Sequence, residues 1–133
     1  GVHRRPADRI RMGMGIMKAF NPEWSGDHTY NRKKQTLTLR GANLNCIGYE
    51  GQTFLKFIHL SSLDISETGL LELHDIRGLS VEQLDIRGLP VKNIVVLRHI
   101  PDLRTVIVLK GQFNQNELEL LGRYATVIEY IEP

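Results

Sequence analysis

Three stretches with one shared pattern of apolar residues decide the fold: Leu60-Ser61-Ser62-Leu63-Asp64-Ile65, Val81-Glu82-Gln83-Leu84-Asp85-Ile86 and Leu103-Arg104-Thr105-Val106-Ile107-Val108. Each stretch is apolar at its first, fourth and sixth positions. Leu84 follows Leu63 by 21 residues, and Val106 follows Leu84 by 22. A fixed period of this length is typical of proteins built from stacked repeats.

The remainder of each unit repeats as well. Four apolar residues follow Ile65 and four follow Ile86 at the same offsets. Alternation in the first half of a unit predicts a strand with one buried face, and a spacing of about three in the second half predicts a helical turn on the opposite side. The eight residues are Leu70, Leu73, Ile76 and Leu79 in one unit and Val91, Ile94, Leu97 and Ile100 in the next.

Residues 36 to about 131 therefore resemble the short bacterial leucine-rich repeats of about 21 to 22 residues. The resemblance implies an α/β fold, a short right-handed solenoid. Its family pattern has asparagine at the ninth position, where Thr68 is the one residue in this chain that could substitute. The resemblance places parallel strands near residues 36–40, 62–66, 83–87, 105–109 and 126–130.

Capping elements are expected at both ends of such a repeat. Residues 8–20 are predicted to form an N-terminal helix that begins at Asp8 and ends at Asn21-Pro22. The polar residues 25–35 are predicted to form a loop. Residues 1–35 would thus be a cap and loop. The apolar stripe of the predicted helix consists of Ile10, Met14 and Met17.

At the other end, residues 114–124 are predicted to form a C-terminal helix. Asn114 and Glu117 have the spacing of a capping box. Val127 lies 21 residues after Val106, which predicts a fifth repeat strand. Residues 36–133 would be the repeat domain, and together with the cap they would form one structural unit.

Composition limits the classes of function. The chain has 17 basic and 15 acidic residues, a formal charge of +2. This balance predicts neither a nucleic-acid nor a membrane partner. Cys46 is the single cysteine, so no internal disulfide can form, and we expect an inert core thiol in a cytoplasmic protein. No apolar run approaches the roughly 18 residues of a membrane span.

Basic residues cluster at two places near the start of the chain. Residues 1–9 hold four basic side chains including His3, and residues 32–34 are Arg-Lys-Lys. We interpret both as solvated segments. The alternative, a basic arm that contacts phosphates, predicts binding with a steep dependence on salt. It would use Arg4, Arg5, Arg32, Lys33 and Lys34.

The sequence contains no convincing catalytic pattern. The five histidines do not form a metal-ligand pair, so we predict no metal and no cofactor, and we do not expect an enzyme. Asp64 and Asp85 occupy equivalent positions in neighbouring units. Paired carboxylates can act as acid and base, but we interpret these two as a solvated acidic column on a strand face.

That strand face is the predicted functional surface. Alternation points Leu63 inward and Asp64 outward, and the outward rows change from basic and polar through acidic to apolar. Ile107 and Leu109, with Ile128 or Tyr130, would form an apolar patch that either contacts a partner or is covered by terminal segments or a missing domain. The candidate partner-binding residues are Arg40, Asp64, Asp85, Arg87, Ile107 and Leu109.

Leucine-rich repeats are mostly protein-recognition modules. The resemblance therefore implies a non-catalytic protein–protein interaction module that uses the strand face. The alternative is a structural or regulatory domain of a larger enzyme, for example a bacterial serine/threonine kinase, packed against its catalytic domain. The expected partner is thus a protein or a neighbouring domain, and the oligomeric state stays open.

Overall fold

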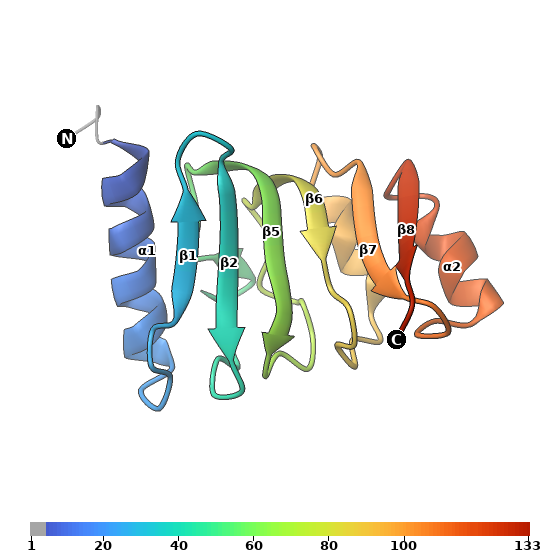
Figure 1. Ribbon diagram of the computed structural model, residues 1–133, viewed down its shortest axis with the longest axis horizontal. Helices are drawn as coiled ribbons and strands as arrows, with labels where there is room; N and C mark the ends of the chain where they lie inside the picture. Colours follow the sequence, from blue (N-terminus) through green and yellow to red (C-terminus); the bar gives the residue numbers. More distant parts are fainter. Residues whose placement is uncertain (1–4) are drawn as a thin grey trace.

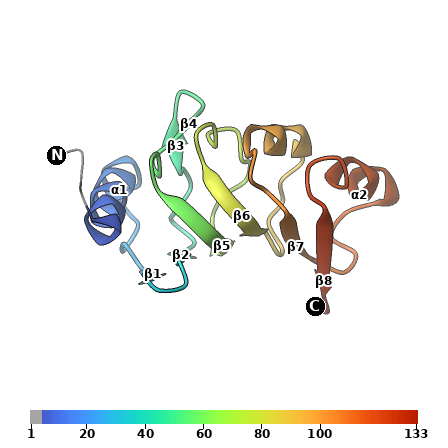
Figure 2. The same ribbon diagram turned by 90° about the horizontal axis from the view of Figure 1, so that it is seen from above.

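The computed structural model describes residues 5–133 and has one six-stranded sheet, with the helical segments gathered on one of its faces (Figures 1 and 2). The strand order is β1-β2-β5-β6-β7-β8, and a separate pair, β3-β4, forms a small hairpin. The strands are β1 His28–Asn31, β2 Thr36–Gly41, β3 Gly48–Tyr49, β4 Gln52–Thr53, β5 His59–Thr68, β6 Ser80–Asp85, β7 Thr105–Leu109 and β8 Val127–Ile131. The helices are α1 Pro6–Phe20, η1 Ile94–His99 and α2 Gln115–Leu121, where η1 is a 3₁₀-helix.

The predicted fold class, a leucine-rich-repeat solenoid, is wrong. The fold is an α/β fold around a mixed sheet, in which β1 runs antiparallel to β2 and the strands from β2 onward are parallel. The connections between the parallel strands also differ from one another. The connection from β2 to β5 contains the β3-β4 hairpin, and the one from β5 to β6 is irregular. The connection from β6 to β7 contains η1, and the one from β7 to β8 contains α2, so no helical segment repeats from one connection to the next.

The first strand is where the prediction and the structure differ most. Residues 28–31 were expected in a loop because their sequence, His-Thr-Tyr-Asn, is polar and lacks apolar alternation. They form β1 because a tight turn brings them back along β2, and Gln35 adopts a positive φ of 55° in that turn. The hairpin adds an antiparallel edge that no repeat pattern could predict.

Apolar residues of the parallel strands line up in one row. Leu37 pairs with Leu63, Leu63 with Leu84, and Leu84 with Val106. These four side chains are at most 1 % exposed. Each contributes about 1.5–3 kcal/mol of burial free energy, so this row forms the centre of the core.

The fifth parallel strand has a different register from the one expected. Val127 pairs with Thr105, and Ile128 pairs with Val106. Because side chains alternate between the two faces of a strand, a shift of one residue exchanges the faces. Ile128 therefore packs against the core, while Val127 is 50 % exposed.

Helix α1 closes the N-terminal end. It begins at Pro6, so Arg5 rather than Asp8 is its N-cap, and Asp8 lies in the first turn. The part of the predicted basic terminus that falls on residues 1–4 lies outside the described residues. The predicted stripe Ile10, Met14 and Met17 is buried, as is Gly13.

Two side chains just after α1 join it to the sheet. Asn21 is 4 % exposed, and its side chain makes four hydrogen bonds. Its amide group donates to the carbonyls of Met17 and Cys46, and its Oδ1 accepts from the backbone N–H groups of Asn45 and Cys46. Trp24 is 2 % exposed, and its Nε1 donates to the Arg40 carbonyl at 2.7 Å. This junction fixes the end of β2, where the site begins.

Helix α2 closes the other end. The predicted capping box is confirmed, because Asn114 accepts from the Glu117 N–H and Glu117 accepts from the Asn114 N–H. The helix ends at Leu121, three residues before the predicted end, and Leu121 is fully buried. In residues 5–133, no helical segment has the length and hydrophobicity that spanning a bilayer requires.

Candidate functional site

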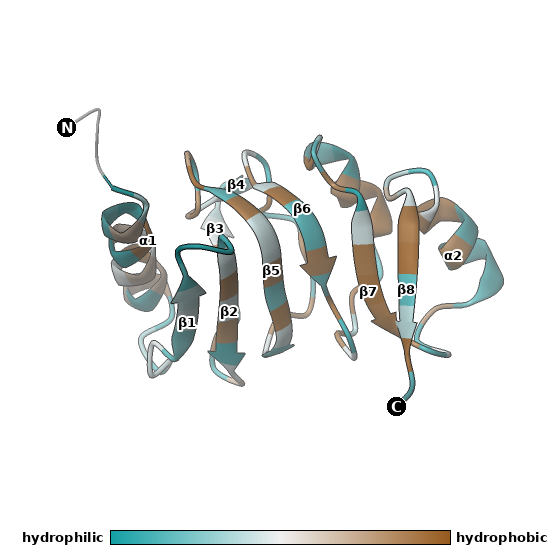
Figure 3. Cartoon of the chain, turned by 45° about the horizontal axis from the view of Figure 1, so that its top comes forward, coloured by the Kyte–Doolittle hydropathy of each residue, from teal (hydrophilic) through white to brown (hydrophobic). Residues whose placement is uncertain are grey.

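The outer face of the sheet, which points away from the helices, has no covering element within residues 5–133 (Figure 2). Parallel sheets are usually covered on both faces, because the helices that connect their strands pack there, and such strands are apolar on both sides. Here β5 and β6 present mainly polar side chains on the outer face. β7 is apolar nearly throughout (Figure 3).

Asp64 organises the polar part of this face. Its Oδ1 accepts hydrogen bonds from the N–H of Ser66 at 3.0 Å and from the Ser66 hydroxyl at 2.6 Å. Such local bonds compete with the regular ladder. The register of β2 against β5 shifts at this point, so that Thr38 pairs with Asp64 but Arg40 pairs with Glu67. The irregularity aims Arg40 at both carboxylates.

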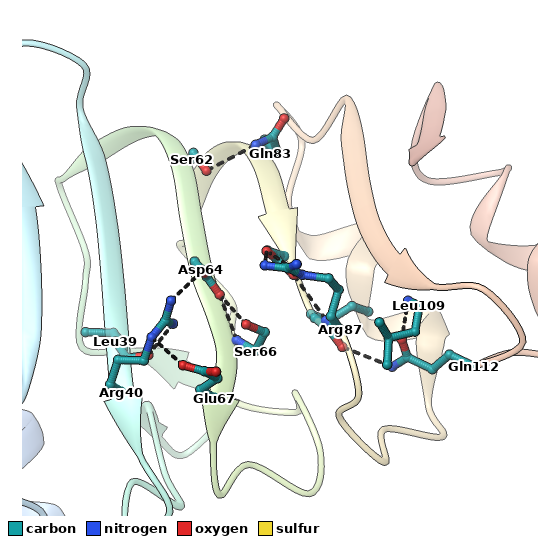
Figure 4. Close-up of polar contacts among 12 residues, drawn as sticks. Leu39, Arg40, Ser62, Asp64, Ser66, Glu67, Gln83, Arg87, Leu109 and Gln112 are labelled. Carbon is teal, nitrogen blue, oxygen red and sulfur yellow. Dashed lines mark hydrogen bonds and ion pairs between the residues drawn. The ribbon is translucent and has the colours of Figure 1, made fainter. Parts of the chain in front are cut away.

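The Arg40 side chain connects β2 to β5 (Figure 4). Its NH2 group lies 3.0 Å from Asp64 Oδ2, and its Nε lies 2.8 Å from Glu67 Oε2. Burial acts to raise the pKa of Asp64, but hydrogen bonds from Arg40 and Ser66 outweigh it and hold that pKa below its ordinary value. The hydrogen bond to Asp64 raises the pKa of Arg40.

Asp85 repeats the arrangement one strand further on. It pairs with Asp64 in the register of β5 and β6, and its Oδ1 accepts from the N–H of Arg87, two residues later. The Arg87 guanidinium binds the same carboxylate through Nε at 2.9 Å and NH2 at 2.8 Å. This hydrogen bond raises the pKa of Arg87. Asp85 is only 5 % exposed, so it lies beneath the arginine.

A shallow hollow of about 200 Å³ lies between the two ion-pair groups. Arg40 and Arg87 line it from opposite sides, and Leu109 supplies an apolar wall. Gln112 holds that wall in place: its Oε1 accepts from the Leu109 N–H at 2.9 Å, and its Nε2 donates to two carbonyls after β6 (Figure 4). Ser66 and Glu67 complete the lining.

The apolar part of the outer face lies on β7 and β8. Register with Thr105, Ile107 and Leu109 places Val127, Glu129 and Ile131 on this face. The expectation that Ile128 or Tyr130 would complete the patch is therefore wrong by one residue. Both point to the opposite face, in register with Val106 and Val108.

The structure brings the six predicted residues onto one face but gives them different roles. Arg40, Arg87 and Leu109 line the hollow. Asp64 and Asp85 lie behind the arginines, where both carboxylates are occupied by hydrogen bonds. The acid–base alternative finds no support in this geometry, since each carboxylate holds a guanidinium and a backbone N–H. Ile107, half-buried, pairs with Asp85.

A second polar group was missed in the sequence. His59 Nδ1 lies 2.8 Å from the Ser80 hydroxyl, which donates to Asp102 at 3.0 Å, and His59 Nε2 lies 3.1 Å from Glu82. Ser80 thus lies between His59 and Asp102 and links the start of β5, the start of β6 and the segment before β7. The sequence contains a signal for this group, because its residues have the spacing of the repeat. Ser80 follows His59 by 21 residues, and Asp102 follows Ser80 by 22.

Comparison with known proteins identifies no relative. No family model matches the sequence, and no curated protein or solved structure is significantly similar to the chain.

Proposed function

We propose that this protein is a non-catalytic interaction module that binds a protein partner through the outer face of its sheet. One observation carries the proposal: within residues 5–133 a largely parallel sheet leaves one face open, and that face holds a hollow with a charged rim and an apolar wall. Apolar side chains on an otherwise open sheet face are typical of contact sites. With a single cysteine, we place the interaction in the reducing cytoplasm.

The charges on the face favour a protein over a nucleic acid. Two guanidinium groups, on Arg40 and Arg87, lie among three carboxylates, on Asp64, Glu67 and Asp85. Because each guanidinium already binds at least one carboxylate, the group has little net attraction for a polyanion. A polypeptide that offers an apolar side chain for the Leu109 wall and a polar group for the exposed edge of Arg87 fits this surface.

The charged side chains that line the hollow are already ordered in the free protein. Arg40 is fixed by contacts with Asp64 and Glu67, and Arg87 is held by Asp85 through two nitrogens. Side chains that are ordered in the free protein lose less entropy on association. The ion pairs would therefore favour binding by keeping the two arginine side chains ordered. The apolar wall at Leu109 would favour it by burying apolar surface of the partner.

The test is selection of binders from a displayed random-peptide library, followed by affinity measurements on variants. Leu109→Asp and Glu67→Lys alter the wall and the rim, whereas Arg98→Ala changes an exposed residue of η1 on the helical side. We expect the selected peptides to lose at least about tenfold in affinity for the first two variants. Equal binding to all three, with thermal unfolding unchanged, would refute the outer face as the docking surface.

A further inference from the structure

The two edges of the sheet differ in how they are protected. β1 at one edge is four residues long, carries exposed polar side chains and leads into the basic turn at residues 32–34. β8 at the other edge, Val127–Ile131, has no proline, no lysine and no irregularity in its register. Short strands, lysine, proline and bulges are the devices by which edges avoid pairing. β8 has five residues and lacks lysine, proline and a bulge, and its one charged side chain is Glu129.

Backbone groups on one side of β8 have no partner strand among residues 5–133. The Val127 N–H donates to the Arg104 carbonyl at 2.8 Å, and the Ile131 carbonyl accepts from the Lys110 N–H at 2.9 Å. In a parallel pair, alternate residues direct both of their backbone groups to the neighbouring strand. Residues 127, 129 and 131 therefore bond to β7, and the N–H and C=O groups of Ile128 and Tyr130 face the free edge.

Helix α2 extends past β8 on the inner side of the sheet, both in the front view and from above (Figures 1 and 2). The inward row of core residues ends with Val106 and Ile128. Helix α2 lies over the end of this row and extends further than β8 (Figure 2). Tyr130, in the same inward set, is still 50 % exposed. A strand added beside β8 would extend this row and cover Tyr130.

Charge indicates which kind of strand fits. Residues 110–133 contain four glutamates but only Lys110 and Arg123 as basic residues. Glu129 lies on the outer side of β8 and forms no ion pair with any residue in the described range 5–133. Two copies joined through β8 would bring two acidic ends together, whereas a basic strand would neutralise this one.

We propose that the free edge of β8 binds an extended peptide segment that alternates apolar with basic residues and adds to the sheet as a seventh strand. Its backbone bonds to the groups of Ile128 and Tyr130, its apolar side chains pack beneath α2, and its basic side chains reach Glu129. Strand addition at an open edge is an established mode of peptide recognition. This site is separate from the outer-face hollow.

The test uses fluorescence anisotropy with a labelled synthetic peptide of about nine residues, long enough to span an average strand, that alternates valine with lysine. One comparison peptide alternates valine with glutamate, and another carries N-methyl groups on the residues that would donate to β8. We expect each change to weaken binding at least about tenfold. Binding that survives N-methylation would overturn strand addition, and binding of the acidic peptide with equal affinity would overturn the role of charge.

Two protein variants locate the site. Tyr130→Pro removes an N–H that faces the free edge and leaves the β7 ladder intact, and Glu129→Lys reverses the charge. Both should weaken binding at least about tenfold; Glu50→Lys, the same change at a remote turn, and Glu67→Lys in the outer-face hollow should not. If neither edge variant affects binding, the proposal is wrong. A dimer of the free protein that Tyr130→Pro abolishes would replace the peptide with a second copy.

Discussion

The first strands of the sheet and the last two are held together by different chemistry. From β1 to β5, polar contacts cross between elements: Trp24 donates to the Arg40 carbonyl, and Arg40 binds Asp64 and Glu67. At β7 and β8 the contacts between strands are apolar, and the ion pair between Lys110 and Glu132 is largely exposed. The N-terminal half should therefore respond to pH and to the loss of single polar groups, and the C-terminal half to changes in apolar packing.

The strongest test of this comparison is Trp24→Ala. The substitution empties a fully buried site and removes the hydrogen bond to the end of β2, so we expect a loss of about 3–5 kcal/mol in the free energy of unfolding. Urea denaturation measures it. The control is Phe57→Ala, an aromatic residue that is 81 % exposed, for which we expect a change within about 0.5 kcal/mol. A loss for Trp24→Ala as small as the one expected for Phe57→Ala would show that the junction at Trp24 is unimportant.

A smaller effect is expected at the C-terminal end from Asn114→Ala, which removes the N-cap of α2. The expected loss is about 1 kcal/mol, together with faster amide exchange confined to α2. Asn116→Ala is the matched control inside the same helix. It should be neutral or slightly stabilising, because alanine favours helix more than asparagine does. If the two variants change stability equally, the capping box makes no net contribution.

The smallest effect is a change in acid sensitivity at Asp64. Its pKa is depressed in the folded protein, so its contribution to stability is present above the unfolded pKa of about 3.9 and is lost as pH falls through the lower folded value. Asp64→Asn should therefore unfold with a shallower pH dependence below about pH 4 than the wild type. Asp27→Asn, which changes an exposed carboxylate, should follow the wild type. Parallel curves for Asp64→Asn and the wild type would contradict this linkage.

The parallel strands could be predicted because their apolar residues repeat along the chain. Leu37, Leu63, Leu84 and Val106 were aligned by spacing, and the structure pairs them in that order. The fold class was not predictable from this spacing, since it contains no information on the antiparallel β1 or on the form of each return segment. β1 forms through pairing with β2 and a turn at Gln35, neither of which has a hydrophobic signature.

The site was predicted in position but not in detail. Alternation placed Arg40 and Asp64 on the outer face, as observed. The burial of Asp85 beneath Arg87 depends on a side-chain contact that periodicity does not encode. Gln112 was missed because its role depends on a long-range bond to the Ile86 carbonyl, 26 positions earlier.

The separation of inner and outer side chains along each strand has a consequence for how this protein can change over evolution. Leu63 and Asp64 are adjacent in the chain, yet the first lies in the packed interior and the second lies on the outer face, where it binds Arg40. Substitutions at exposed outward positions can therefore change the chemistry of the outer face while the inward row keeps the architecture intact. Within residues 5–133, the uncovered face of the sheet is thus a surface whose side chains can diverge between lineages at little cost in folding, except where they take part in the ion pairs of Asp64 and Asp85.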